Sequence, residues 1–384
     1  MAAETGRPLR LLFHVQHLLG IGHLRRAALV SAALADAGFA VTVAQGGMPD
    51  ATFDFGAATI EQLPPLRSAD AGFTGLADAA GRPLDAAGEA ARRDALLALY
   101  QRVRPDLVLL ESFPFGRRQM RFELMPLLDR VARTAPRPRV AVSIRDLLQR
   151  RKPERERETV AVVRAHVDRV LVHGDPALVA LEESFGPAAE IEAKLRYTGY
   201  VAPAAPSPRP RDRVVVSAGG GAVGAALLRA ALAARPLTRL ANRPWTLLAG
   251  PNLPEPDLAA LEAAAPGAVS IERSVPDLAA ALAGAVVSVS QGGYNTLMDI
   301  AVSATPAVIV PFAGQGETEQ PTRAARLAAM GAVTVVAEAD LAPQTLARAI
   351  DTAAGRPSRW PALDLDGAAA SARLLGALAA EGPR

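Results

Sequence analysis

Short apolar runs alternate along the chain with longer segments whose apolar positions recur at the spacing of an amphipathic helix. In the first half, runs of strand length occupy residues 9–15, 39–44, 58–63, 107–110, 139–144 and 169–172. Helical spacing is found at 24–37, 86–103, 118–133 and 159–166. Strands that alternate with helices are typical of a parallel sheet covered by helices. The pattern therefore predicts an α/β domain of the Rossmann-like kind.

The same alternation restarts after a proline-rich segment at residues 201–212. Strands are expected at 214–216, 245–249, 268–271, 285–289, 307–311 and 332–336, and helices at 222–234, 256–264, 276–283, 319–330, 342–354 and 367–380. A proline-rich stretch is stiff and extended, which suits a linker. We expect a first domain at 1–200, a linker at 201–212, a second domain at 213–365, and a terminal segment at 366–384 that could pack back on the first domain.

Two stretches of the first domain depart from this pattern. Residues 64–84 are rich in Gly, Pro, Ala and Asp and are expected to form a loop that could cover a site. Residues 145–158 interleave arginines with Glu154, Glu156 and Glu158, which favours a solvated helix with i,i+4 ion pairs over an anion-binding patch.

Composition narrows the class of protein. The 384 residues contain no cysteine, which excludes disulfides and thiolate metal sites. The formal charge of +3 is small for this length, so a nucleic-acid partner is not indicated. No uncharged apolar run reaches the length of a membrane-spanning helix, and the first residues lack the apolar core of a signal peptide. We expect a soluble cytoplasmic protein.

A glycine-rich turn follows the first strand of the second domain, with the sequence S-A-G-G-G-A at 217–222. Glycines between a strand and a helix allow the backbone to approach an anion, and the helix start offers free N–H groups. Ser217 could donate a further hydrogen bond, so the turn has the chemistry of a diphosphate site. The alternative is a tight turn that uses glycine only for packing.

Residues 285–323 contain two further polar clusters, each after an expected strand. Gly292 and Gly293 open a helix that carries Asn295 and Asp299 four residues apart, on one face. A carboxylate there could accept both hydroxyls of a ribose, or it could serve only the helix dipole. The second cluster is Glu317, Glu319 and Gln320; it suits a polyhydroxyl ligand, or simply an acidic first helical turn.

Candidate bases lie in the first domain. His23 follows a glycine-bearing loop and starts a helix, where an imidazole could act as a general base near neutral pH. His14 and His17 are expected to be structural. Glu111 and Asp146 each end an expected strand, and either could be the base instead of His23 or could be a capping residue.

Taken together, these motifs resemble the GT-B glycosyltransferases of family 28, the family of the lipid-II-forming N-acetylglucosaminyltransferase. The resemblance rests on S-A-G-G-G-A at 217–222, S-Q-G-G-Y-N-T-L-M-D-I-A at 290–301, P-A-V-I-V-P-F at 306–312, E-T-E-Q-P-T-R-A at 317–324, and G-I-G-H-L-R-R at 20–26. It implies two Rossmann-like domains that face each other across a cleft. Residues 40–200 match the family only in organisation.

The resemblance also implies roles for residues. The loop at 217–222, with the N-terminal glycine loop, would hold the donor diphosphate; Asp299, in place of the more usual Glu, would bind ribose. Glu319 and Gln320 would contact the donor sugar, and Glu319 departs from the pair typical of relatives, which leaves the sugar open. The full set of expected donor-binding residues is Gly20, Gly22, Ser217, Gly219, Gly220, Gly221, Arg273, Val275, Gln291, Gly292, Gly293, Asn295, Asp299, Glu317, Glu319 and Gln320.

By the same resemblance the reaction would be metal-independent and inverting, with no cofactor besides a nucleotide-diphosphate sugar, most simply a UDP-sugar. The catalytic candidates are His23, Glu111 and Asp146. The acceptor would be a small molecule, a glycan or a lipid-linked molecule, with at most peripheral membrane contact. Two alternatives remain: a nucleotide-sugar 2-epimerase or hydrolase on the same fold, and a non-catalytic nucleotide-sugar binding protein.

Overall fold

The computed structural model of the chain describes residues 7–18, 22–69, 75–220, 224–357 and 359–381. These residues form two compact units, one made of residues 1–201 and 364–384 and the other of 202–363. Each unit is described below by itself.

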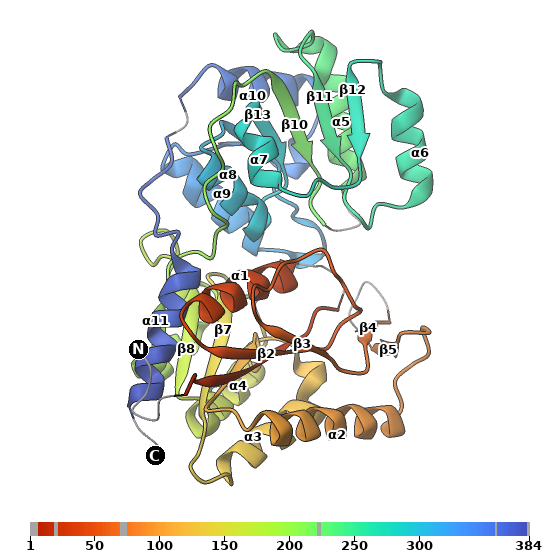
Figure 1. Ribbon diagram of the computed structural model, residues 1–384. Helices are drawn as coiled ribbons and strands as arrows, with labels where there is room; N and C mark the ends of the chain where they lie inside the picture. Colours follow the sequence, from red (N-terminus) through yellow and green to blue (C-terminus); the bar gives the residue numbers. More distant parts are fainter. Residues whose placement is uncertain (1–6, 19–21, 70–74, 221–223, 358, 382–384) are drawn as a thin grey trace. The chain divides into compact units, whose positions relative to one another are not determined.

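Unit 1 is built on a seven-stranded sheet whose strands are all parallel (Figure 1). The spatial order is β3-β2-β1-β6-β7-β8-β9. The strands are β1 (Arg10–Val15), β2 (Ala40–Gln45), β3 (Thr59–Gln62), β6 (Leu107–Glu111), β7 (Arg139–Arg145), β8 (Arg169–His173) and β9 (Leu195–Tyr197).

Helices cover both faces of this sheet because successive strand residues point to opposite sides. Leu12 packs into a core shared with α2 (Ala86–Val103), α3 (Arg121–Ala132) and α4 (Pro153–His166). Its neighbours Leu11 and Phe13 pack into a second core with α1 (Gly22–Asp36) and α11 (Gly367–Ala380). Helix α11 belongs to unit 1 and packs along α1. The backbone N–H of Tyr200 donates to the carbonyl of Asp364 at 2.7 Å, which joins the two segments of the unit.

Unit 2 has a six-stranded parallel sheet in the order β12-β11-β10-β13-β14-β15. Its strands are β10 (Arg213–Ser217), β11 (Trp245–Leu248), β12 (Val269–Glu272), β13 (Ala285–Ser290), β14 (Ala307–Ile309) and β15 (Thr334–Val335). Helices α5 (Ala225–Ala234), α6 (Glu255–Ala264) and α10 (Pro343–Ala354) share one core with the alternate strand residues Val214 and Val216. The other helices are α7 (Leu278–Ala283), α8 (Tyr294–Ser303) and α9 (Glu319–Ala329).

The α/β prediction is confirmed, with local corrections. The expected loop at 64–84 contains two short antiparallel strands, β4 (Leu66–Ser68) and β5 (Leu76–Asp78), too short to give a periodic signal. Strand β9 was not expected either. The helix expected to begin at residue 159 begins at Pro153, because Pro at the first helical position and Glu154 and Glu156 in the first turn suit a helix start.

Candidate functional site

Both sheets have the strand order 3-2-1-4-5-6 when their first six strands are numbered along the chain. The direction of connection reverses between β1 and β6 in unit 1, and between β10 and β13 in unit 2. In open parallel sheets, ligands bind beyond the carboxyl ends of the strands at such a reversal. Each unit therefore has one position where its fold favours a ligand.

The reversal point of unit 1 brings together His23, at the start of α1, and Glu111, the last residue of β6. The His23 Nδ1 atom lies 2.9 Å from Glu111 Oε1. The carboxylate is fully buried, while 19% of the His23 side chain is exposed. A ring whose Nδ1 donates to a carboxylate keeps its lone pair on Nε2, which is the arrangement of a general base.

Charges around the pair set its protonation. Burial alone would raise the pKa of Glu111, but the positive charge of Arg26 and the hydrogen bonds from His23 and Ser143 hold it well below its ordinary value. Burial, reinforced by the charge of Arg117, lowers the pKa of His23 well below 6.5 in spite of the hydrogen bond to Glu111. At neutral pH the pair is therefore a carboxylate beside a neutral imidazole.

The pair is the exposed end of a buried chain of hydrogen bonds across adjacent strands. The hydroxyl of Ser143 in β7 donates to Glu111 Oε2 at 2.7 Å and lies 2.8 Å from Nε2 of His173 in β8. His173 Nδ1 is 2.9 Å from the hydroxyl of Thr198. Because the single hydrogen of Ser143 goes to Glu111, His173 Nε2 carries the hydrogen that Ser143 accepts. Burial and the charge of Arg26 lower the pKa of His173 to about 3.

The geometry favours His23 over the two other expected bases. Glu111 is saturated by an ion pair with Arg26 and by its bonds to His23 and Ser143, and it has no exposed side-chain surface. Asp146 is also fully buried, and the Tyr200 hydroxyl donates to its Oδ2 at 3.1 Å. Both acids hold the structure around the site instead of facing solvent.

His14 and His17 are both buried. His14 Nε2 lies 3.0 Å from Glu123 Oε1, and Glu123 forms a buried ion pair with Arg92. His17 packs so closely against Gly47 that a β-carbon there would meet its ring at 2.3 Å. These contacts give His14 a structural role and place His17 in the packing of the strand ends.

Sequence reasoning missed the residues that complete the unit 1 site: Arg26, Arg117, Ser143, His173 and Thr198. Arg26 follows His23 by one helical turn, a spacing that could have indicated it. Arg117 donates from Nε to the carbonyl of Gln16 at 2.8 Å. Burial and the charges of Arg145 and Arg26 lower the pKa of Arg117 to about 10, although the charge of Glu111 acts to raise it. The partners of Ser143 and His173 come from distant strands and leave no local pattern.

The reversal point of unit 2 begins with the glycine turn after β10. Gly219 has a φ of +72°, a conformation that only glycine adopts without strain. Ser217 is buried, and its hydroxyl accepts from the Gly219 N–H at 3.5 Å. The Asn252 amide donates to the carbonyl of Gly220 at 2.6 Å. These bonds hold the turn at Gly219 and Gly220, both of which are half-buried. Gly221 lies outside the described residues, as does Gly20 of unit 1.

The second turn of unit 2 leads from β13 into α8. Gly293 is the N-cap of α8 and makes no side-chain capping bond. A β-carbon on Gly292 would lie 3.4 Å from Gln320 and Ile309, so this turn lies against the start of α9 and the end of β14. Gln291 is half-buried, and a β-carbon on Gly219 would approach its Oε1 to 3.7 Å. Both glycine turns therefore lie together at one edge of the sheet.

Two of the three acidic residues expected to touch a donor, Asp299 and Glu317, have different surroundings in the structure. Asp299 has no exposed surface, whereas Asn295 on the same face of α8 is half-buried. Glu317 accepts from the backbone N–H groups of Glu319 and Gln320, at 2.6 and 3.3 Å, and so caps the start of α9. These contacts engage Glu317 in the protein backbone, and the ribose role of Asp299 stays a prediction.

Four of the remaining expected donor residues lie at the same edge of unit 2. Glu319 is buried at the start of α9, and Gln320 Oε1 accepts from the Phe312 N–H at 3.1 Å. Arg273 donates to the carbonyl of Leu253 at 3.1 Å and pairs with Glu255, and Val275 is half-buried. Gly22 is the first residue of α1 in unit 1.

The described residues offer neither a metal site nor a membrane-spanning helix. No group of three or more His, Asp or Glu side chains there could hold a metal ion. No helix in the same residues is long and apolar enough to cross a membrane.

Comparison with known proteins gives one family match and partial relatives. Residues 215–368 match the glycosyltransferase family 28 C-terminal domain. A UDP-N-acetylglucosamine–N-acetylmuramyl-(pentapeptide) pyrophosphoryl-undecaprenol N-acetylglucosamine transferase of Brucella canis is 39% identical over 83 residues, 22% of each chain. Its counterpart in Brucella anthropi is 36% identical over 86 residues. These matches span less than a quarter of the relatives' length.

Solved structures resemble nearly the whole chain. A calicheamicin glycosyltransferase has a TM-score of 0.62 at 15% identity, covering 97% of this chain and 98% of its own. A spinosyn rhamnosyltransferase in complex with thymidine diphosphate scores 0.60 at 19% identity, with 98% and 97% coverage. MurG of Acinetobacter baumannii scores 0.55 at 15% identity, with 98% and 96% coverage. At these identities the likeness shows the fold, which is GT-B.

Proposed function

Since this chain has the GT-B fold and carries a family 28 glycosyltransferase C-terminal domain at residues 215–368, we propose that it transfers a sugar from a nucleotide-diphosphate donor to an acceptor hydroxyl. The observation that carries the proposal is that each unit has its own polar site at its reversal point: a neutral histidine beside a carboxylate in unit 1, and two glycine turns in unit 2.

His23 is the proposed base. Its Nε2 takes the proton of the acceptor hydroxyl as that oxygen forms a bond to the anomeric carbon of the sugar. The bond from that carbon to the diphosphate breaks, and the nucleoside diphosphate leaves with the electron pair. Glu111 holds the imidazole by Nδ1 and stabilises the imidazolium that forms, so it acts as a positioning residue.

Unit 2 is the proposed donor-binding unit. The backbone around Gly219, and the start of α8 behind Gly293, offer N–H groups and the positive end of a helix dipole to a diphosphate. Such preorganised donors stabilise negative charge where it develops on the leaving group. The backbone can thereby supply stabilisation that a metal ion would otherwise provide, which supports metal-independent transfer.

One base and a direct displacement lead to inversion at the anomeric carbon. For the donor we propose a uridine diphosphate sugar first, since the partial relatives are named for a UDP-sugar; a structural neighbour binds thymidine diphosphate, so that nucleotide is the first competitor. Small-molecule, glycan and lipid-linked acceptors are the classes to test.

A nucleotide panel tests the proposal. Thermal unfolding of the full chain is measured with UDP, TDP and GDP and their sugars, and nucleoside diphosphate release is then followed with and without acceptors of the three classes. The proposal predicts a rise in Tm with one nucleotide and release that depends on an acceptor. Acceptor-independent release would indicate a hydrolase, and a Tm shift without release would indicate a binding protein. No shift with any nucleotide would contradict the donor site.

A further inference from the structure

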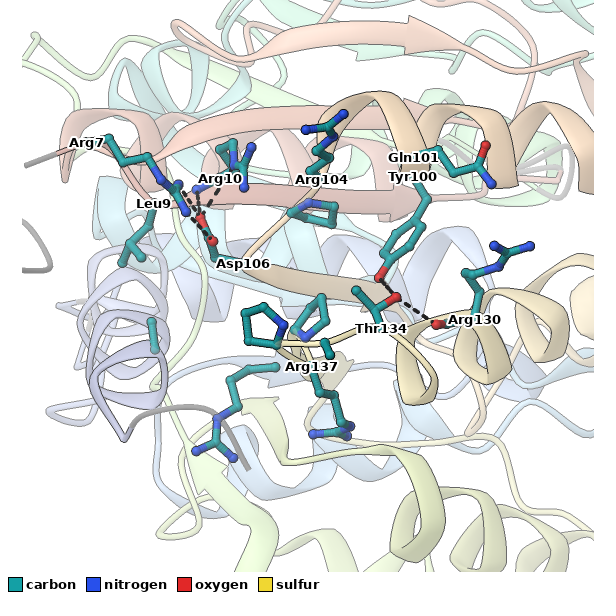
Figure 2. A pocket seen from close by; sticks show the side chains of 16 residues that line it. Arg7, Leu9, Arg10, Tyr100, Gln101, Arg104, Asp106, Arg130, Thr134 and Arg137 are labelled. Atoms are coloured by element: carbon teal, nitrogen blue, oxygen red, sulfur yellow. Dashed lines mark hydrogen bonds and ion pairs between the residues drawn. The ribbon is translucent and has the colours of Figure 1, made fainter. Parts of the chain in front are cut away.

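A groove of about 790 Å³ lies in unit 1 at the amino ends of the strands, the opposite end of the sheet from His23 and Glu111. It is bounded by the starts of β1, β6 and β7 and by the carboxyl ends of α2 and α3 (Figure 2). Its volume falls within the range of about 300–1,000 Å³ that is usual for small-molecule sites. None of the residues named in the proposed transfer reaction lines it.

Arginine dominates the lining. Six arginines line the groove: Arg7, Arg10, Arg104, Arg130, Arg137 and Arg139. Among the described residues that line it, Asp106 is the only carboxylate. Asp106 accepts two bonds of 2.7 Å from Arg7 and one of 2.8 Å from the Arg10 N–H. Asp168, behind the groove, accepts from Arg137 at 3.0 and 3.2 Å. Arg139 also lies within ion-pair distance of Asp168, at 3.7 Å. The arginines of the lining therefore outnumber the carboxylates that the described residues place against them.

Arg104 and Arg130 contribute most directly to this excess. Among the described residues, neither side chain pairs with a carboxylate. Both are exposed, and Figure 2 shows them on either side of Tyr100, whose hydroxyl donates to Thr134 at 2.9 Å. Arg130 lies close enough that its charge opposes the burial that raises the pKa of Tyr100.

A simpler role for these two arginines is to offset the helix dipoles, since Arg104 caps α2 and Arg130 lies in the last turn of α3. Each helix end carries about half a negative charge. Two such ends together offset about one positive charge, whereas Arg104 and Arg130 carry two, so the dipoles do not neutralise the groove. Helices α2 and α3 each place an arginine at the same groove, and an anion between the two arginines would be favourable.

We propose that this groove binds a phosphate-bearing ligand of the diphosphate or phosphate monoester class. Arginine is the side chain best suited to such a group, because its planar guanidinium donates two parallel bonds to phosphate oxygens. Leu9, Pro105, Pro138 and Ala379 give the groove apolar walls for the remainder of the ligand. A soluble molecule and a lipid head group can both carry the phosphate.

The test compares two charge-matched double variants of the full chain. R104A/R130A removes two arginines from the groove. R93A/R121A removes two arginines of the same helices outside the groove, the half-buried Arg93, which pairs with Asp94, and the exposed Arg121. Inorganic pyrophosphate binding is measured by isothermal titration calorimetry at 150 mM salt, with excess UDP and TDP present to occupy a donor site. We expect at least a tenfold weaker Kd for R104A/R130A and a change below twofold for R93A/R121A.

A second arm identifies the source of the phosphate. Sedimentation with phosphatidylcholine vesicles, with and without phosphatidic acid, is measured for the same proteins. If R104A/R130A loses binding only to vesicles that contain phosphatidic acid, the site is assigned to a lipid head group. Equal binding by all three proteins in both arms, or equal losses in the two double variants, would overturn the proposal.

Discussion

Nδ1 of His23 lies 2.9 Å from Oε1 of Glu111, although the two residues are 88 positions apart in the chain. The contact exists because the first helix of unit 1 starts beside the carboxyl end of β6, where the connections of the sheet reverse. It holds Nδ1 of the imidazole against a buried carboxylate and leaves Nε2 as the proton acceptor. The functional predictions follow from this relationship and from the glycine turns of unit 2.

Glu111→Gln should lower both transfer and stability. The substitution removes the buried negative charge between Arg26 and His23, and breaking a buried ion pair in this way costs about 3–5 kcal/mol of the free energy of unfolding. Urea unfolding measures the loss. Glu158→Gln is the control, since Glu158 forms an exposed pair with Arg118 and should cost less than about 1 kcal/mol. Similar losses in the two variants would contradict the buried network.

Stability should fall as the pH drops below 6.5. The pKa of His173 is about 3 in the folded protein, so between pH 3 and 6.5 the unfolded chain binds the extra proton. The lowered pKa of Glu111 acts in the same direction below its ordinary value of 4.5. We expect the free energy of unfolding to decrease by a few kcal/mol from pH 7 to pH 4, with a smaller slope in His173→Gln. A stability independent of pH over this range would refute the assignment of a neutral buried His173.

Transfer should be nearly constant from pH 6.5 to 8 and decline only at more acidic pH. The base must be neutral to accept a proton, and burial holds the pKa of His23 well below 6.5. The pH profile of kcat/KM measures this for the free enzyme. An acidic limb with its midpoint at or above 6.5 would mean that His23 is not the group observed.

Gly219→Ala should weaken donor binding and cost about 1–2 kcal/mol of stability, because its φ of +72° is unfavourable for any residue with a β-carbon. Gly267→Ala is the control: it lies in an exposed turn of the same unit and a β-carbon there meets nothing within 4 Å. Calorimetric titration with the nucleotide measures the donor affinity of both variants, and urea unfolding measures their stability. Unchanged donor affinity in Gly219→Ala would remove the turn from the donor site.

Chelation should leave transfer unchanged, since backbone N–H groups at the glycine turns are proposed to stabilise the leaving diphosphate. The measurement is nucleoside diphosphate release in EDTA and again after Mg²⁺ or Mn²⁺ is restored. Activity that is lost in EDTA and recovered with the metal would contradict metal-independent transfer.

The parallel-sheet architecture was predictable because it rests on local signals. Apolar strand-length runs and glycine turns gave the positions of β1, β10 and β13, and the helix at 86–103 was predicted with its observed bounds. The ribbon of β4 and β5 was not, since its three-residue strands are specified by pairing with each other and not by periodicity.

The site was predictable only in part. His23 could be singled out from its place after a glycine loop, but the choice between His23, Glu111 and Asp146 depended on burial that no local pattern reveals. The same holds for Ser143 and His173, which join the site through strand order alone. For Asp299 the local pattern was informative, but burial was not predictable. Its spacing from Asn295 places both residues on one helical face, and the Asp299 side chain on that face is fully buried.

Chemical rescue of His23→Ala tests the central claim most directly. The account predicts a fall in kcat of about 10²–10⁴-fold, an unchanged Kd for the donor nucleotide, and partial recovery of kcat with added imidazole. His166→Ala, at the end of α4 and at the opposite end of the sheet from His23, should retain wild-type kcat. If His23→Ala keeps wild-type turnover, or if its loss comes entirely from donor binding, His23 is not the base.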